Sequence, residues 1–146
     1  MHEPIIIFDI DGTLADCRHR QKYLLQKPKN WKSFFAEALK DEPVKAMQIL
    51  NQSLAQSGSF SILLCTGRPE SMRRQTEEWL KKHSIIFDGL LMRPEGDHRQ
   101  DYSVKSEMLA GMDKKRILFV IDDRRQAVEM WRREGLLCLQ CDDGDY

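Results

Sequence analysis

Residues 5–13 read Ile-Ile-Ile-Phe-Asp-Ile-Asp-Gly-Thr, and this stretch decides the fold class. An unbroken apolar run over residues 5–8 is typical of a parallel β-strand that is covered on both faces. Asp9 and Asp11 come at its end, and residues two apart on an extended chain project to the same side. Both carboxylates can therefore face one centre, and Gly12 permits a tight turn directly afterwards.

Apolar runs and helical patterns alternate along the rest of the chain, which indicates βα units and a parallel sheet of about five strands. We expect an α/β, three-layer Rossmann-like fold in which residues 1–146 form a single domain. A small helical insert follows the first strand, and this insert and the helix after it cover about residues 17–58. The expected strands are residues 5–9, 60–65, 86–92, 116–121 and 137–140. The expected helices are residues 43–58 and 103–110, a helix that opens at Pro69 and a helix that ends at residue 134.

The composition is that of an ordinary globular protein without a strong charge bias. The 146 residues include 23 basic and 23 acidic side chains, so any attraction for nucleic acid must come from a local patch. No secretory signal opens the chain, and its apolar runs are far shorter than the roughly 20 residues that span a bilayer. We therefore expect a cytoplasmic protein with reduced thiols and no membrane partner.

The Cys138-x-x-Cys141 pair leaves two interpretations open. It is compatible with zinc or redox chemistry. Tetrahedral zinc needs about four ligands, however, and the sequence offers no second Cys or His pair. We favour an incidental pair near the last strand.

Polar side chains follow the other expected strands as well. Thr66 and Gly67 offer a hydroxyl and backbone N–H groups ahead of a helix, which suits phosphoryl oxygens. Asp122 and Asp123 add a second acidic pair, and carboxylates around one point favour Mg²⁺. Lys105 begins a short helix, where the dipole disfavours a cation unless an anion lies opposite. Each group also has a purely structural interpretation: an acidic pair can cap a helix, Thr66 can be a turn residue and Lys105 a solvated surface lysine. We favour the functional interpretation because several strands deliver these groups to one sheet edge.

Four motifs along the chain resemble the signature of the haloacid dehalogenase superfamily. In order, they are Asp-x-Asp-Gly-Thr-Leu from Asp9, Thr66-Gly67-Arg68, Lys105 and Ile121-Asp122-Asp123. The resemblance implies an Mg²⁺-dependent phosphohydrolase that acts through an aspartyl phosphate. It makes Asp9 the nucleophile, Asp11 the general acid/base and Lys105 the charge-neutralising amine. It also implies that the phosphoryl group is bound by Thr66, Gly67 and Arg68. The implied metal ligands are Asp9, Asp11 and Asp122, with Asp123 in support and a main-chain carbonyl of Ile10 or Asp11 as a further ligand.

Charge considerations predict additional cations at such a site. Four carboxylates and a phosphate dianion carry six negative charges, whereas Mg²⁺ and one lysine return three. Like charges at ~4 Å repel by about 4 kcal/mol at an effective dielectric near 20. We therefore expect arginines from the surrounding loops to help a carboxylate approach the phosphate.

A narrower resemblance concerns the substrate. Residues 121–135 and the stretch Gly144-Asp145-Tyr146 resemble the end of the phosphatase domain of phage polynucleotide kinase–phosphatases, and residues 93–105 are also similar to that domain. It removes 3′-phosphates and 2′,3′-cyclic phosphates from nucleic-acid ends. The matching implies active-site roles for Arg20, Arg68, Arg93, Asp101 and Arg124. The chain has Thr66 where that domain has serine, and residues 18–40 match poorly.

The leading hypothesis is therefore a polynucleotide 3′-phosphatase with a nucleic-acid 3′-phosphate end as its partner. Without a Gly-x-x-x-x-Gly-Lys-[Ser/Thr] loop the sequence shows no kinase module, so a kinase or ligase would be a separate partner. The alternatives are a phosphatase of a small metabolite or free nucleotide, and a non-catalytic phosphate-binding protein. Trp31, Phe34 and Phe35 either stack on a base or form the core of the insert, and we favour the core.

Overall fold

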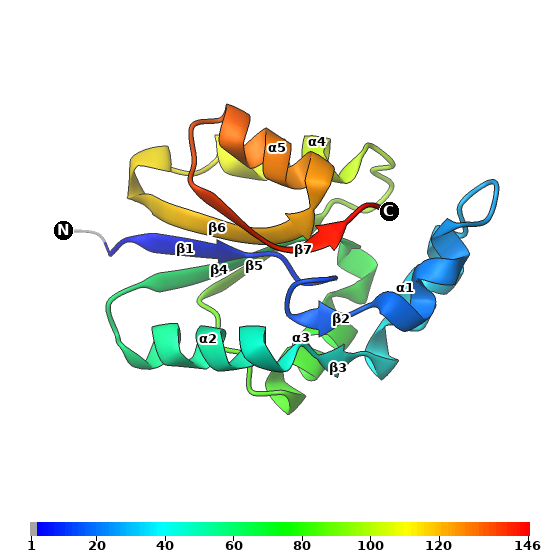
Figure 1. The fold of residues 1–146 in the computed structure, drawn as a ribbon, viewed down its shortest axis with the longest axis horizontal. Helices are drawn as coiled ribbons and strands as arrows, with labels where there is room; N and C mark the ends of the chain where they lie inside the picture. Colours follow the sequence, from blue (N-terminus) through cyan, green and yellow to red (C-terminus); the bar gives the residue numbers. More distant parts are fainter. Residues whose placement is uncertain (1–2) are drawn as a thin grey trace.

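The computed structural model describes residues 3–146 and contains a five-stranded parallel sheet between two layers of helices (Figure 1). The sheet has the order β5-β4-β1-β6-β7. Its strands are β1 (Ile5–Phe8), β4 (Ser61–Pro69), β5 (Gly89–Arg93), β6 (Ile117–Arg124) and β7 (Cys138–Gly144). Helices α2 (Lys45–Gln56) and α3 (Arg73–Lys82) cover one face, and α4 (Asp101–Ala110) and α5 (Arg125–Arg133) cover the other. The expected three-layer α/β fold is confirmed.

The apolar run of β1 holds the two layers together. Its side chains alternate between the faces, so Ile6 and Phe8 pack with α2 and α3 while Ile5 and Ile7 pack with α4 and α5. All four are buried, and each such side chain stabilises the fold by about 1.5–3 kcal/mol. A polar residue at any of these positions would face a core, which explains why the opening stretch has no alternation.

The order of the strands places a crevice beyond the end of β1. The chain runs from β1 to β4 on one side and reaches β6 on the other, and ligands bind at such switch points, outside the carboxyl ends of the strands. The backbone N–H of Asp9 still donates to the Ile121 carbonyl at 3.0 Å, after which the chain leaves the sheet. Asp9 therefore lies at the floor of this crevice.

An insert projects beyond the same end of the sheet (Figure 1). It is closed at its base by the antiparallel pair β2 (Ala15–Asp16) and β3 (Glu42–Pro43). Between them lie the 3₁₀ helix η1 (Arg18–Leu24), α1 (Trp31–Ala36) and the 3₁₀ helix η2 (Ala38–Lys40). The small helical insert predicted after the first strand is therefore confirmed.

Some predicted element boundaries are wrong. The strand predicted to end at residue 65 continues to Pro69, which is extended (ψ 154°) and pairs with Arg93. Pro69 therefore precedes the 3₁₀ helix η3 (Glu70–Met72) as its N-cap, and the α-helix α3 begins only at Arg73. The strand predicted from residue 86 begins at Gly89, because the buried Asn51 amide bonds both the N–H and the carbonyl of Ile86 at 2.9 Å.

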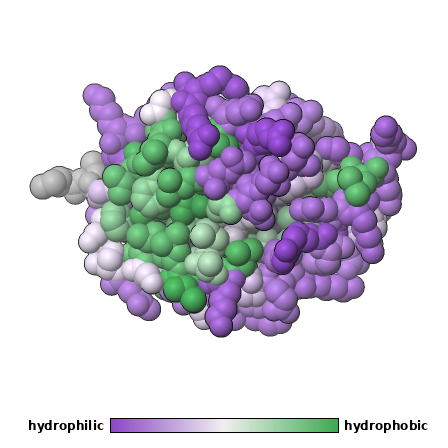
Figure 2. All heavy atoms as spheres, viewed as in Figure 1, coloured by the Kyte–Doolittle hydropathy of each residue, from purple (hydrophilic) through white to green (hydrophobic). Residues whose placement is uncertain are grey.

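The end of the molecule that carries the insert is mostly hydrophilic, whereas apolar residues gather on the opposite half of the surface in Figure 2. Exposed leucines of β6 and the edge strand β7 include Leu118 and Leu139. Within residues 3–146, no helix has the length and apolar character needed to cross a bilayer.

Candidate active site

Three carboxylates from adjacent strands meet at the crevice floor. Asp9 follows β1, and Asp122 and Asp123 lie near the end of β6, with one oxygen of each within 4.8 Å of the others. All three are buried. Burial and the neighbouring Asp122 raise the pKa of Asp9 well above its ordinary value and that of Asp123 to about 6. The cluster is therefore short of positive charge, and its oxygen donors suit a hard divalent cation.

Lys105 of α4 supplies one positive charge from the side. Its Nζ donates to Asp9 Oδ1 at 2.8 Å and to Asp122 Oδ2 at 2.9 Å, and it lies 3.2 Å from Asp101 Oδ2. Burial alone would lower the pKa of this amine, but the three carboxylates outweigh it and raise the pKa well above its ordinary value. Lys105 is thus a cation, and with all three clustered carboxylates ionised the group would carry a net charge of −2, which a divalent ion would neutralise.

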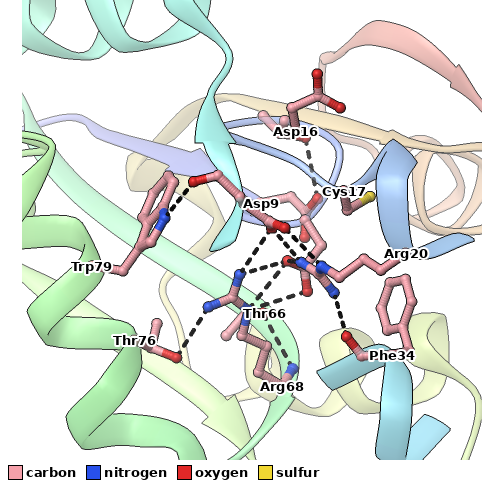
Figure 3. A network of polar contacts seen from close by, with 12 residues as sticks. Asp9, Asp16, Cys17, Arg20, Phe34, Thr66, Arg68, Thr76 and Trp79 are labelled. Atoms are coloured by element: carbon pink, nitrogen blue, oxygen red, sulfur yellow. Dashed lines mark hydrogen bonds and ion pairs between the residues drawn. The ribbon is translucent and has the colours of Figure 1, made fainter. Parts of the chain in front are cut away.

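The side chain of Asp11 points away from this cluster and toward two arginines. Arg20 donates to Asp11 Oδ1 at 2.5 Å, and Arg68 donates to the same atom at 2.7 Å. Figure 3 shows these two guanidinium groups facing each other across the network. Although burial opposes it, Arg20 and Arg68 hold the pKa of Asp11 well below its usual range. Asp11 is therefore ionised in this arrangement.

The three carboxylates that lie together include Asp123, whereas the set predicted to hold the metal contained Asp11 instead. The main-chain carbonyl of Asp11 is still close, because the Tyr146 hydroxyl lies 3.1 Å from that carbonyl and 3.0 Å from Asp123 Oδ2. Asp9, Asp122 and Asp123 would hold the ion, and the Asp11 carbonyl is the neutral oxygen beside them.

Asp41, which the sequence analysis missed, anchors Arg20. Its carboxylate accepts from Arg20 Nε at 2.9 Å and from Nη2 at 2.5 Å, and both side chains are buried. The Asp41 carbonyl accepts from the Trp79 indole at 2.9 Å, and Arg20 Nη1 donates to the Phe34 carbonyl at 3.2 Å. The insert therefore delivers Arg20 to Asp11 on a fixed support. The only signal in the sequence was that a buried arginine requires a carboxylate partner.

The predicted phosphoryl-binding residues occupy different depths. Thr66 and Arg68 are buried, and the Thr66 hydroxyl accepts from the Arg68 backbone N–H at 3.2 Å. Gly67 lines the cavity above Asp9, and a Cβ at this position would overlap the Asp101 carboxylate. The loop therefore needs glycine so that α4 can bring Asp101 and Lys105 against it.

A cavity of about 560 Å³ opens above the acidic cluster and contains two of the predicted arginines, Arg93 and Arg124. Arg93 donates to the Gly67 carbonyl at 2.8 Å and to two further main-chain carbonyls. Arg124 donates to the Tyr146 carbonyl at 2.9 Å. Neither forms a salt bridge within residues 3–146. Both guanidinium charges are therefore free to meet an anion in the cavity.

The aromatic residues of the insert divide into two groups. Phe34 is buried in a small core with Cys17 and Leu24, as expected. Trp31, by contrast, is 37% exposed, although all three rings contribute to the lining of the cavity. The prediction that all three aromatic residues form the insert core is therefore wrong for Trp31.

The Cys138 and Cys141 thiols are free, and burial raises the pKa of both to about 12. Cys141 Sγ lies 3.6 Å from the Thr13 hydroxyl, which in turn donates to Asp9 Oδ2 at 3.1 Å. Cys141 thus packs behind the nucleophile that the motif predicts.

Comparison with known proteins agrees with this geometry. The family model for the polynucleotide kinase PNKP phosphatase domain matches residues 3–146. A chain in a structure of the Pnkp1/Rnl/Hen1 RNA repair complex is 32% identical, with a TM-score of 0.82 over 99% of this chain and 44% of that one. A second structure of the Pnkp1/Rnl/Hen1 complex gives the same identity and TM-score over 100% of this chain and 48% of the other. The chain thus spans less than half the length of these relatives.

More distant structures share the fold. A haloacid dehalogenase-like hydrolase from Streptococcus pneumoniae is 16% identical, with a TM-score of 0.61 over 94% of this chain and 84% of that one. A class C acid phosphatase from Bacillus anthracis with tungstate bound is 14% identical, with a TM-score of 0.66 over 100% of this chain and 69% of that one.

Proposed function

The chain belongs to the phosphatase-domain family of polynucleotide kinase PNKP, within the haloacid dehalogenase superfamily, and from this membership we propose that it removes 3′-phosphates from nucleic-acid ends. The proposal includes 2′,3′-cyclic phosphates, an aspartyl-phosphate intermediate and Mg²⁺ as the cofactor. We propose in addition that residues 1–146 act as one phosphatase domain, with the insert and its following helix at about residues 17–58. The observation that supports it most directly is Asp9 itself, which is held by Lys105 at the floor of a cavity where Arg93 and Arg124 form no salt bridge with an Asp or Glu side chain of residues 3–146.

In the first step, an oxygen of Asp9 attacks phosphorus in line and the bond to the leaving 3′-oxygen breaks. Lys105 and Thr13 each bond one oxygen of Asp9, so the carboxylate is oriented before the substrate arrives. The leaving oxygen takes a proton from Asp11. In the second step, water attacks the phosphoryl group on Asp9, Asp11 accepts the proton of that water, and inorganic phosphate leaves.

The protonation of Asp11 changes during this cycle, and the arginines provide a means of control. While Arg20 and Arg68 bond Asp11, its carboxylate stays ionised, which suits the base of the second step. A phosphate dianion competes for the same guanidinium groups. Each contact that moves from Asp11 to the phosphate raises the pKa of Asp11, and this favours the protonated form that the first step needs.

Asp9, Asp122 and Asp123 would hold the Mg²⁺ ion, which would neutralise charge on the phosphoryl oxygens and orient them. Arg93 and Arg124 would bind the outer phosphoryl oxygens or the preceding phosphate from within the cavity. Gly67 would offer its backbone N–H there, and the buried Thr66 would support this loop.

We propose RNA ends as the biological substrate, because the relatives in the matched structures belong to a Pnkp1/Rnl/Hen1 RNA repair complex. A separate kinase or ligase then acts on the same ends, since a ligase needs a 3′-hydroxyl and the phosphatase reaction produces one.

One assay panel tests these proposals. The purified protein with Mg²⁺ receives RNA and DNA oligonucleotides with 3′-phosphates, the same oligonucleotides with 5′-phosphates, cyclic-ended RNA, mononucleotides and an aryl phosphate. We expect the highest kcat/KM on the 3′-phosphorylated ends, with none left in Asp9→Asn, whose amide cannot form the intermediate. Faster turnover of mononucleotides would instead identify a small-metabolite phosphatase. A protein without hydrolysis under any divalent metal would be a phosphate-binding partner only.

A further inference from the structure

We infer that Trp31 forms a stacking surface for the terminal nucleobase of the strand whose 3′-phosphate lies on Asp9. This inference rests on the proposed function and adds a base-binding subsite to it. The chemical class of the ligand is a planar purine or pyrimidine ring without regard to its identity, because every base presents a π-face to an aromatic side chain.

The exposure of Trp31 distinguishes it from the other tryptophans. Trp79 and Trp131 are 2% and 0% exposed, and their indole N–H groups donate to the Asp41 carbonyl and to Asp122 Oδ2. Both therefore have structural partners inside the protein. Trp31 is 37% exposed at the start of α1 and lines the cavity.

The ring of Trp31 is fixed from behind, so stacking on it requires little ordering. It stacks on Phe35 with the ring planes inclined by 26° and the centroids 5.8 Å apart, and it packs edge-to-face with Phe34, with the centroids 5.7 Å apart. Phe34 is buried, and the Arg20 guanidinium covers its ring at 4.3 Å. The aromatic surface is therefore connected rigidly to an arginine of the proposed active site, and a preorganised surface loses less entropy when a ligand binds.

The stacking surface and the acidic cluster belong to one cavity. Its lining includes Asp9 and Lys105 as well as Trp31, and its volume of about 560 Å³ lies within the range of small-molecule sites. Arg124 connects the two parts, since its backbone N–H donates to Asp122 Oδ1 at 3.2 Å while its guanidinium lies 5.7 Å from the Trp31 centroid. Arg124 alone thus reaches from the acidic cluster, where the phosphate would bind, to the stacking surface of Trp31. A terminal nucleotide must likewise reach from its phosphate to its base.

The charges around Trp31 match a polyanion. Lys29 Nζ lies 5.6 Å from the ring centroid, and Lys32 also lines the cavity. Cations beside an aromatic surface are the usual arrangement of single-strand binding grooves, where the cations follow the phosphates and the rings stack on the bases. A neutral protein thereby gains a local basic patch.

The first experiment compares two substrates that differ only in the terminal base. Both are oligonucleotides with a 3′-phosphate, and one has an abasic sugar at its last position. We expect Trp31→Ala to lower kcat/KM about tenfold on the base-bearing end and less than about twofold on the abasic end, because base–aromatic stacking is worth about 1–3 kcal/mol per base. Trp31→Phe should retain most of the activity, and Leu25→Ala, which alters an exposed apolar residue of the same insert, should match wild type.

The second experiment does not require the Trp31→Ala variant to fold. In Asp9→Asn, the 3′-phosphorylated oligonucleotide should quench tryptophan fluorescence more than its abasic counterpart does, because Trp79 and Trp131 are shielded. Asp9→Asn combined with Trp31→Phe should lose this difference. Equal losses of kcat/KM on both substrates, or equal quenching by both, would mean that Trp31 only packs the insert, and the inference would be overturned. Wild-type protein that hydrolyses no 3′-phosphate would overturn the proposed function first, before any variant is compared.

Discussion

Replacing Asp41 by alanine tests whether the insert positions the active site. The change removes the two Asp41 oxygens that accept hydrogen bonds from the Arg20 guanidinium, and that guanidinium is completely buried. Removal of one partner from a buried ion pair costs about 3–5 kcal/mol. Arg20 keeps its bond to Asp11, so we expect the lower end of that range, about 3 kcal/mol.

A loss of this size leaves the variant folded under native conditions, so its stability can be measured. A chain of this length has a free energy of unfolding of roughly 7–20 kcal/mol, and about 3 kcal/mol corresponds to a decrease in Tm of roughly 6–12 °C. Urea unfolding followed by tryptophan fluorescence would measure it, since the Trp79 indole bonds the Asp41 carbonyl. With Arg20 no longer held, kcat on a 3′-phosphorylated oligonucleotide should fall at least tenfold at temperatures where the variant stays folded.

Asp16→Ala is the matched control. It removes a carboxylate that also pairs with an arginine of the insert, but Arg18 is 78% exposed, and exposed ion pairs contribute little. Its unfolding midpoint and kcat should stay close to wild type. If Asp41→Ala lay within about 1 kcal/mol of wild type, or if both variants lost the same stability, the insert would not support Arg20 in the way that we describe.

The other predictions concern the acidic cluster. Lys105→Met should abolish phosphate release. Mg²⁺ should nevertheless raise the Tm of this variant more than that of wild type, because the ion replaces the lost positive charge. An equal increase in Tm for the two proteins would contradict this. The pKa of Asp123 is about 6 in the folded protein, above its ordinary 3.8. In EDTA the ionisation of Asp123 therefore removes stability as pH rises from about 4 to 6, and Asp123→Asn should reduce this loss in urea titrations. Gly67→Ala should lower kcat/KM about tenfold or more, because its Cβ displaces Asp101, and a crystal structure would detect the shift.

The layers of the fold could be predicted because their signals are local. An apolar run such as residues 5–8 specifies a buried strand, and the carboxyl ends of parallel strands must meet at one edge. The approach of Asp9 to Asp122 follows from that geometry, whereas Lys105 reaches both carboxylates from helix α4. The end of β4 could not be predicted in the same way, since Pro69 becomes extended only through its pairing with Arg93.

The direction of the Asp11 side chain was also beyond sequence reasoning. Its spacing from Asp9 predicted that both carboxylates would face one centre, whereas the turn at Gly12 and the two arginines direct Asp11 to a separate position. Asp41 and Arg20 are 21 residues apart, and their pairing depends on how the whole insert folds. Long-range ion pairs of this kind have no sequence period, so only coordinates reveal them.

The position of Asp41 changes the electrostatic argument as well. The predicted excess of negative charge around a bound phosphate required arginines, and Arg20 was one of them. The positive charge of Arg20 is already compensated by the negative charge of Asp41. The Arg20–Asp41 pair therefore positions the Asp11 side chain more than it offsets the negative charge of a bound phosphate. The remaining neutralisation must then come from arginines without carboxylate partners. Arg93 and Arg124 form no salt bridge with an Asp or Glu side chain within residues 3–146, their guanidinium groups bond main-chain oxygens, and both line the cavity above Asp9.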